Sequence, residues 1–401
     1  AGFCALVTFP PVPSAVAARL SLRARLRNGE EQSHDLGEVL LRPAGPPPPE
    51  GHGPAGDLVA VCMATYNPPA DLFRRQVESI RAQTHRNWVC VINDDGSDPA
   101  ALALVRDAVA ADDRFQVQSN PARLGFYRNF EKCLSRVPAG AAFVALSDQD
   151  DYWYPDKLEV LLRQFDAGTT LAYADVRVVD REGRVRAETY WTTRRNNYTN
   201  FATLLLANTV TGAASLFRRD LLDDLLPFPQ DLRGSFHDHW IACTALALGT
   251  IRYVDRPLHD YVQHGSNIIG HYAPGSAGVL GLLRKYSWRC FWPPAVLGLL
   301  LNAGRVGYEF FYLRLRLIAL TLRLRCGGRL EPAKERTLER LGAADDSLAA
   351  QLWLAARGVV RAGRGSDTLG AESVMLRAFL WRHAMRLRAW LHRLRARRRP
   401  R

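Results

Sequence analysis

Residues 141–156 read AAFVALSDQDDYWYPD, and this stretch decides the fold class. Its first seven residues are apolar up to a final serine, which predicts a strand buried on both faces. An acidic turn follows directly, and we expect a helix to begin at Asp156, just after a proline. A buried strand, a polar turn and a helix in succession form the repeating unit of an α/β sheet.

The same unit recurs upstream. Apolar runs at 58–64 (LVAVCMA) and 88–93 (WVCVIN) predict two further strands. The other expected elements are helices at 69–83, 99–111 and 123–135 and a short strand at 115–117. Because apolar strands alternate with helical segments, the pattern predicts a parallel sheet, whose ligands bind beyond the carboxyl ends of the strands.

Polar side chains follow the three long strands. Thr65, Tyr66 and Asn67 follow the first, NDDGSD (93–98) the second and SDQDD (147–151) the third. Two acidic clusters at one sheet edge repel each other unless a hard divalent cation or a ligand rich in donors lies between them. Mg²⁺ or Mn²⁺ with a substrate diphosphate meets that need. The alternatives are an Asp-Gly turn with helix capping for the first cluster and helix-capping acids for the second.

The composition is that of a globular protein. The chain has 401 residues, of which 47% are hydrophobic and 23% charged. No apolar run reaches the roughly 18–20 residues that span a bilayer, and we expect no signal peptide. The seven cysteines include no C-x-x-C pair, so neither a disulfide framework nor a cysteine zinc site is expected. A cytoplasmic location, with peripheral attachment to the inner face of the cell membrane as an option, is the simplest expectation.

Proline content and charge divide the chain into segments. An Asn28-Gly29 turn signal predicts a hairpin near the start. Residues 43–57 are rich in proline and glycine, as linkers are. We therefore expect four segments: a short β extension or the remnant of a preceding module (1–42), the linker (43–57), the α/β domain (58–271) and a basic, mainly α-helical C-terminal region (272–401).

The C-terminal region carries most of the positive charge. Residues 271–401 hold 25 Lys and Arg against 8 Asp and Glu, whereas residues 1–270 hold 28 against 32. Within residues 371–401, ten arginines surround one predicted helical stripe formed by Leu376, Phe379, Leu380, Ala384, Leu387, Leu391 and Leu394. This pattern favours a helix lying on an anionic membrane, with packing on the protein body as the alternative. The aromatic residues follow the stripe rather than forming a stacking platform, so no nucleic acid is expected as a partner.

Six ordered motifs between residues 58 and 271 resemble family 2 glycosyltransferases, and within them rhamnosyltransferase-like members. They are VAVCMATYN, QVESIRAQTHRNWVCVINDDGSDP, LGFYRNFEKCL, ALSDQDDYWYPDKLE, NTVTGAASLFRR and FHDHWIACTALALGTIRYVDRPLHDYVQHGSNIIG. The resemblance implies an α/β fold of the GT-A (Rossmann-like) type, a mixed sheet flanked by helices. It further implies metal-dependent, inverting transfer of a sugar from a nucleoside diphosphate sugar to a hydroxyl of a glycan or lipid-linked oligosaccharide, in cell-surface polysaccharide synthesis. The donor it implies is dTDP-L-rhamnose, with a UDP-sugar as the alternative.

The resemblance also assigns residues on the donor side. It implies that Thr65, Tyr66, Asn67 and Asp95 bind the base and the ribose of the nucleotide. Arg128 and Asn129 would complete the nucleotide-binding wall. The D-x-D element maps to Asp148 and Asp150, of which Asp148 would contact the ribose and, with Asp150, the Mg²⁺ or Mn²⁺ at the diphosphate. Asp151 holds the loop or caps the helix. His264 is either a further metal or phosphate contact or a hydrogen-bonded loop histidine.

On the acceptor side the match is less complete. Gly212 would let the backbone approach the sugar closely. Asp238 occupies the position of the family's catalytic base, which takes the proton of the acceptor hydroxyl. Many relatives have two acids there, whereas this sequence has His237 before the aspartate, so the base role is open to His237 or His239 as well. Trp240 either packs its helix or stacks on a sugar.

Two other classes of protein stay open. A nucleotidyltransferase also uses acids and Mg²⁺ on an α/β sheet, but it needs an early basic loop for a triphosphate, and residues 58–70 contain no Lys or Arg. The non-enzyme alternative is a catalytically degenerate nucleotide- or glycan-binding module. The presence of every motif acid argues against it.

Overall fold

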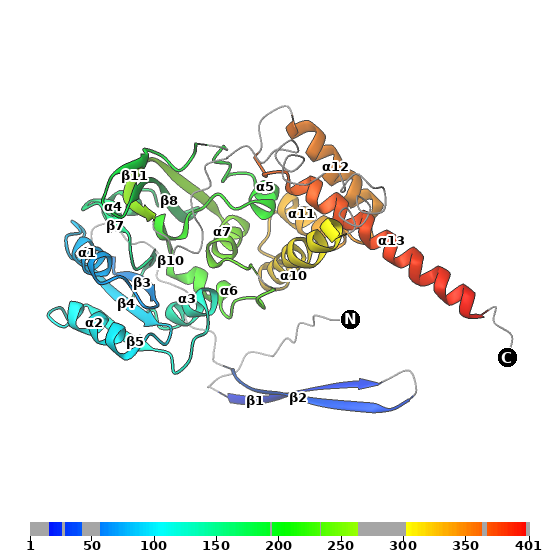
Figure 1. Ribbon diagram of the computed structural model, residues 1–401, viewed down its shortest axis with the longest axis horizontal. Coiled ribbons are helices and arrows are strands. Elements are labelled where there is room, and N and C mark those ends of the chain that lie inside the picture. Colours follow the sequence, from blue (N-terminus) through cyan, green and yellow to red (C-terminus); the bar gives the residue numbers. More distant parts are fainter. Residues whose placement is uncertain are drawn as a thin grey trace, which may run out of the picture. The chain divides into compact units, whose positions relative to one another are not determined.

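The computed structural model describes residues 16–25, 29–41, 57–192, 195–232, 234–263, 302–362 and 367–397 (Figure 1). The chain separates into two compact units, Ala1–His52 and Gly53–Arg401. In the first unit, β1 (Val16–Arg25) pairs antiparallel with β2 (Glu31–Leu41). Gly29, in the connection, has a φ of 86°, a conformation that favours glycine. Of the expected linker at 43–57, only Asp57 is among the described residues.

The first half of the sheet in the second unit is parallel. Its strands β5 (Phe115–Ser119), β4 (Trp88–Asp94), β3 (Val59–Thr65) and β6 (Phe143–Ser147) lie in that order. Val59, Val61 and Met63 of β3 enter one core, and Ala60 and Cys62 enter another on the opposite face. Burial on both faces explains why the strand reads as an unbroken apolar run.

The second half of the sheet is mixed. β10 (Ser215–Arg218) lies antiparallel between β6 and β8 (Thr169–Asp180), and β11 (Thr250–Gln263) runs parallel to β8. The short β7 (Tyr152–Trp153) pairs with β11, and β9 (Val185–Ala187) pairs with β8. The sheet thereby carries nine strands within the described residues.

Helices cover both faces of this sheet (Figure 1). One core contains side chains of α1 (Ala70–Arg81), α2 (Pro99–Val109) and α4 (Lys157–Leu162). The other contains side chains of α3 (Phe126–Leu134), α5 (Phe201–Leu206), η2 (Arg219–Leu221), α6 (Leu222–Leu225) and α7 (His237–Leu248). A 3₁₀ turn, η1 (Gly212–Ala214), precedes β10. The expected α/β class with a mixed sheet flanked by helices is confirmed.

The described residues of the C-terminal region, 302–362 and 367–397, are mainly helical, as expected. After a π-helical turn, η4 (Gly307–Tyr312), come α10 (Leu313–Cys326), α11 (Pro332–Gly342), α12 (Leu348–Ala362) and α13 (Ala371–Arg397). α10 packs against α7, and its Leu315, Ile318 and Leu322 belong to the same core as α7. Among the described helices, none has the length and hydrophobicity needed to cross a bilayer.

The predicted apolar stripe of α13 is divided between two environments. Phe379 is buried and packs edge-on against Tyr312, with ring centroids 4.8 Å apart. Leu380, Leu387 and Leu391 are instead exposed, by 70%, 56% and 41%. The N-terminal half of α13 therefore joins the helical core, and an apolar strip beyond it stays uncovered by the described residues.

Gly249 lies between the end of α7 and the start of β11. A substitution at this glycine tests how tightly the end of α7 packs against the neighbouring chain. A Cβ there would lie 2.5 Å from Cγ2 of Thr170 and 2.7 Å from the carbonyl oxygen of Gly168. We expect Gly249→Ala to lower the free energy of unfolding by about 2–3 kcal/mol in urea denaturation. Gly168→Ala, whose Cβ meets only Asp166 Oδ1 at 3.7 Å, is the matched control and should change it by less than about 1 kcal/mol. Equal effects of the two substitutions would contradict this packing.

Candidate active site

The three polar clusters lie together at the carboxyl ends of β3, β4 and β6. The backbone N–H of Tyr66 donates to Oε1 of Gln149 (2.8 Å), and Gln149 Nε2 donates to the carbonyl of Tyr66 (3.3 Å). The N–H of Asn67 donates to Ser97 Oγ (2.8 Å), and the N–H of Asp98 donates to Asn67 Oδ1 (2.9 Å). Loops that follow three strands are thus joined by direct hydrogen bonds into one surface.

Asp95 anchors the loop between β5 and α3. Its carboxylate accepts hydrogen bonds from the backbone N–H groups of Leu124 (2.7 Å) and Gly125 (2.8 Å) and from Asn120 Nδ2 (3.1 Å). The side chain is nearly buried, at 2% exposure. Asp95 therefore shapes the loop that would border a bound nucleoside.

Asp94, which was given no role from the sequence, links the carboxyl ends of neighbouring strands through buried hydrogen bonds. Its Oδ1 accepts from the hydroxyl of Thr65 (3.1 Å), and its Oδ2 accepts from the hydroxyl of Ser119 (3.1 Å) and from the N–H of Ser97 (2.9 Å). Thr65 is itself buried. Of the T-Y-N segment, Tyr66 is the residue whose ring is exposed, and the guanidinium of Arg123 lies 3.9 Å from its centroid. Arg123 was not predicted from the sequence, although it immediately precedes the loop bound by Asp95.

The two α3 residues expected in the nucleotide-binding wall make internal contacts. Arg128 pairs with Glu131 (2.5 Å) and donates to the carbonyls of Phe228 and Pro229 (3.2 Å each). Asn129 is buried, and its Nδ2 donates to the carbonyl of Asn93 (2.9 Å). Both side chains support the loops around the site, and a direct nucleotide contact by either remains a prediction.

The charges of Asp150, in the loop after β6, and of Asp238, in α7, both act on Asp148. Burial and the negative charges of Asp150 and Asp238 raise the pKa of Asp148 to about 7, while the positive charge of Lys157 acts in the opposite direction. A partly protonated carboxyl at neutral pH is the expected result of crowding like charges. The D-x-D loop and the predicted base therefore lie close together although they are far apart in the sequence.

The first turn of α7 lies directly against Gly212. A Cβ at this glycine would be 3.0 Å from Nε2 of His237 and 3.2 Å from Cβ of Asp238, so a larger residue would force these two side chains to shift. The ring of His237 stacks on Phe130, with centroids 3.8 Å apart, and burial lowers the pKa of His237 to about 3. A stacked imidazole that stays neutral at physiological pH is a weak base, which favours Asp238 for the base role.

The neighbouring α7 residues are engaged in the core. A ring nitrogen of His239 lies 3.0 Å from the carbonyl oxygen of Leu204, within hydrogen-bond distance, and the side chain is buried. Trp240 is 1% exposed, and its indole N–H donates to the carbonyl of Leu225 (3.0 Å). Of the two alternatives for Trp240, the structure shows packing of the helix.

The donor set of the D-x-D loop suits a hard cation. Carboxylate oxygens of Asp148 and Asp150 are ligands that Mg²⁺ and Mn²⁺ prefer. Within the described residues no group of three or more His, Cys, Asp or Glu is arranged to hold a metal. Mg²⁺ usually needs only one or two carboxylates when substrate phosphates and water complete its shell, so the loop fits a cation bound together with a diphosphate. His264 lies outside the described residues.

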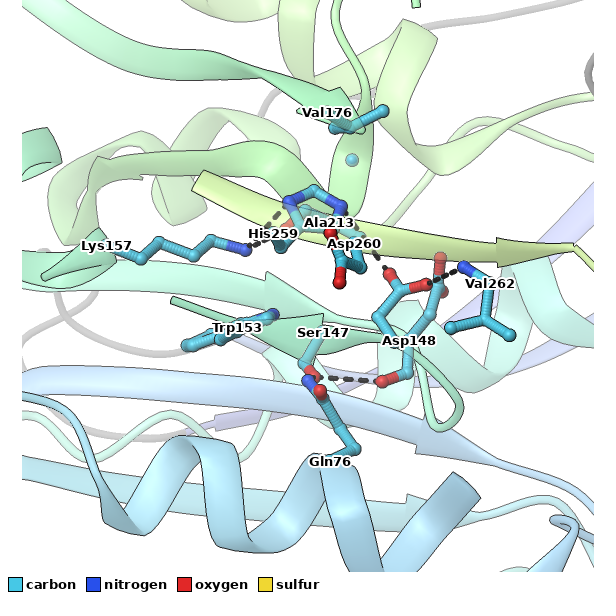
Figure 2. Close-up of polar contacts among 12 residues, drawn as sticks. Gln76, Ser147, Asp148, Trp153, Lys157, Val176, Ala213, His259, Asp260 and Val262 are labelled. Carbon is cyan, nitrogen blue, oxygen red and sulfur yellow. Dashed lines mark hydrogen bonds and ion pairs between the residues drawn. The ribbon is translucent and has the colours of Figure 1, made fainter. Parts of the chain in front are cut away.

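Behind this loop lies a buried charged group that the sequence analysis did not single out (Figure 2). Asp151, which we expected to hold the loop or cap the helix, accepts a hydrogen bond from the N–H of Val262 in β11 (3.3 Å). Beside it, His259 and Lys157 are fully buried. Lys157 begins the helix KLEVLL, where a lysine reads as surface charge, so the sequence carried no signal of its burial.

Comparison with known proteins relates part of the chain to one family. Residues 60–226 match the sequence model of the family described as Glycosyl transferase family 2. Among curated proteins, the chain is 33% identical over 113 residues to "Uncharacterized protein y4gI" of Sinorhizobium fredii, covering 28% of this chain and 12% of the relative. It is 30% identical over 234 residues to "Putative glycosyltransferase EpsH" of Bacillus subtilis, covering 53% and 63%. The chain thus spans less than two thirds of the length of either relative.

Among solved structures, residues 1–349 of S. aureus TarS in complex with UDP-GlcNAc align with a TM-score of 0.48 at 16% identity, over 82% of this chain and 92% of that chain. The family match and the mixed sheet flanked by helices identify the fold as GT-A.

Asp95→Ala tests the loop anchor at the strand tips. Removing the carboxylate leaves two backbone N–H groups without their acceptor, so we expect the free energy of unfolding to fall by about 2–4 kcal/mol in urea denaturation. Asp98→Ala is the matched control, because this exposed side chain accepts one long bond, from Asn67 Nδ2 (3.3 Å). It should cost less than about 1 kcal/mol. A loss at Asp95 no larger than at Asp98 would contradict the anchoring role.

Proposed function

We propose that this GT-A protein, whose residues 60–226 match family 2, is an inverting glycosyltransferase. It moves a sugar from a nucleoside diphosphate donor to a hydroxyl of a glycan or lipid-linked oligosaccharide in cell-surface polysaccharide synthesis. The observation that carries the proposal is that the D-x-D loop is hydrogen-bonded through Gln149 to the loop after β3 and that the charge of Asp238 acts on Asp148. A cation-binding pair beside a base suits inverting glycosyl transfer from a diphosphate, whereas a degenerate binding module has no need of all three acids.

The nucleoside is proposed to bind along the joined loops of β3 and β4. Tyr66 offers an exposed aromatic face, backed by Arg123, on which a base can stack. The loop held by Asp95 lies beside it. On the motif resemblance the donor is dTDP-L-rhamnose, and a UDP-sugar is the alternative. A panel of nucleotide sugars tested by thermal shift with Mn²⁺ distinguishes the two.

Asp148 and Asp150 would hold Mg²⁺ or Mn²⁺ at the diphosphate. The bound ion supplies neutralisation of the charge on the leaving nucleoside diphosphate. Asp148 would contribute as a carboxylate. The two side chains thereby orient the donor, with its diphosphate at the D-x-D loop.

Asp238 is proposed to act as the general base. It lies in the first turn of α7, where the helix dipole favours negative charge, and the guanidinium of Arg314 lies close enough to attract it. Asp238 takes the proton of the acceptor hydroxyl as the hydroxyl oxygen attacks the anomeric carbon and the bond to the diphosphate breaks. One displacement inverts the anomeric configuration. General base catalysis of this kind contributes about 10²- to 10⁴-fold.

Two features of the C-terminal helices favour the proposal that the acceptor is linked to a lipid in an anionic membrane. A recess of about 470 Å³ opens between η4 and α13. Its lining is mostly apolar, but Arg314, the neighbour of Asp238, and Arg377 are also part of it. An apolar recess with guanidinium groups suits an amphiphile with a phosphate head group. The exposed strip of α13, with Leu387, Trp390 and Leu391 among many arginines, suits the membrane surface beside it.

Substitution of the two kinds of acid separates their roles. Asp150→Asn and Asp238→Asn should each lower sugar transfer by about 10²- to 10⁴-fold. Asp150→Asn should also weaken Mn²⁺-dependent binding of the donor's nucleoside diphosphate in calorimetry, because it removes a metal ligand, whereas Asp238→Asn should not. Asp223→Asn, at an exposed position of α6, is the control and should behave like the wild type. Wild-type nucleotide affinity in Asp150→Asn would exclude the metal assignment.

Membrane binding is tested on the exposed strip of α13. The triple change Leu387→Gln, Trp390→Gln and Leu391→Gln should lower cosedimentation with phosphatidylglycerol vesicles about tenfold, because it removes the apolar groups that insert. Leu348→Gln with Leu352→Gln removes exposed leucines of α12 and serves as the control. Unchanged vesicle binding by the triple variant would refute the membrane role.

A further inference from the structure

A buried charged cluster lies behind the D-x-D loop, and the proposed reaction gives it no task. Lys157 of α4, Asp151 of the loop and His259 of β11 are each 0% exposed. Burying an ammonium or a carboxylate is costly unless each is paired and hydrogen-bonded. A fully buried lysine at this place therefore needs a physical reason.

Lys157 joins three parts of the site (Figure 2). Its Nζ donates to the carbonyl of Ala213 in η1 (2.5 Å) and lies 3.4 Å from Nδ1 of His259. The ring centroid of Trp153 is 3.8 Å from the same nitrogen, so an aromatic face covers the remaining side. Ala213 follows Gly212 directly, and this contact thus ties α4 to the turn that lies against the predicted base.

Asp151 completes the chain of contacts on the loop side. Its Oδ2 lies 3.6 Å from Nε2 of His259, and its Oδ1 accepts from the N–H of Val262. Burial raises the pKa of Asp151 and lowers that of Lys157, and the attraction between the ammonium and the carboxylates of Asp148 and Asp151 opposes both shifts. Lys157 is therefore placed to offset the negative charge of the loop from the inside.

We propose that Lys157 is a positioning residue, the internal counter-charge that holds the acidic loop in place before a cation binds. The inference rests on the proposed function, because it concerns the same loop. Removing the ammonium should change cation affinity and the rate of sugar transfer in opposite directions. Without the ammonium, Asp148 and Asp150 attract a cation more strongly. The turn carrying Gly212 also loses the hydrogen bond that links it to α4. Cation affinity should rise while sugar transfer falls, a combination that damage to the fold would not produce.

The test compares Lys157→Met, which removes the charge and keeps the length, with Lys157→Arg, which keeps the charge. Mn²⁺ binding to the full chain is measured by electron paramagnetic resonance, at the same pH for every variant, without nucleotide and again with UDP. We expect Lys157→Met to bind Mn²⁺ about tenfold more tightly than the wild type and to transfer sugar at least tenfold more slowly. Lys157→Arg should keep wild-type Mn²⁺ affinity.

Equal or weaker Mn²⁺ binding by folded Lys157→Met would overturn the proposal. If that variant does not fold, Lys157→Met with Asp151→Asn removes both members of the buried pair and leaves no isolated charge. The double variant should bind Mn²⁺ within about threefold of the wild type, and much weaker binding would overturn the proposal. A wild-type chain that binds no Mn²⁺ even with UDP present contradicts the proposed metal-dependent function instead, so the two failures are distinguishable.

Discussion

Repulsion between carboxylates gathered at one sheet edge is the constraint on which this structure depends. Asp148, Asp150 and Asp238 lie close enough for their charges, together with burial, to raise the pKa of Asp148 to about 7. Something must offset that repulsion. Buried Lys157 does so from inside, and in the proposed function a cation with its diphosphate does so from the substrate side.

The same edge brings the two halves of the reaction together. The parallel strands β3, β4 and β6 supply loops for a nucleotide, and hydrogen bonds through Gln149 and Asn67 join them. Gly212 lies in η1, directly before the antiparallel β10 that pairs with β6, and it contacts the first turn of α7. α10 packs behind α7 and brings Arg314 toward Asp238, so the C-terminal helices are continuous with the site.

The sequence predicted the parallel half of the sheet well, because β3, β4 and β6 are buried on both faces and read as apolar runs. It also predicted that their polar ends would meet. β11 gave no comparable signal, since its segment RYVDRPLHDY mixes charges with apolar residues along a long pairing with β8. A lysine near a helix start reads as surface charge, so burial of Lys157 was invisible. Likewise, nothing local shows that Arg128 points toward Phe228 and Pro229.

The most direct test of the proposed arrangement of metal, donor and base is anomalous diffraction. The crystal would contain the full chain with Mn²⁺ and a non-transferable nucleoside diphosphate sugar. The account predicts one manganese peak bound by Asp150 and the diphosphate, with the nucleoside against the loop held by Asp95 and the sugar between the metal and Asp238. A manganese peak elsewhere, or a sugar bound away from Asp238, would contradict it.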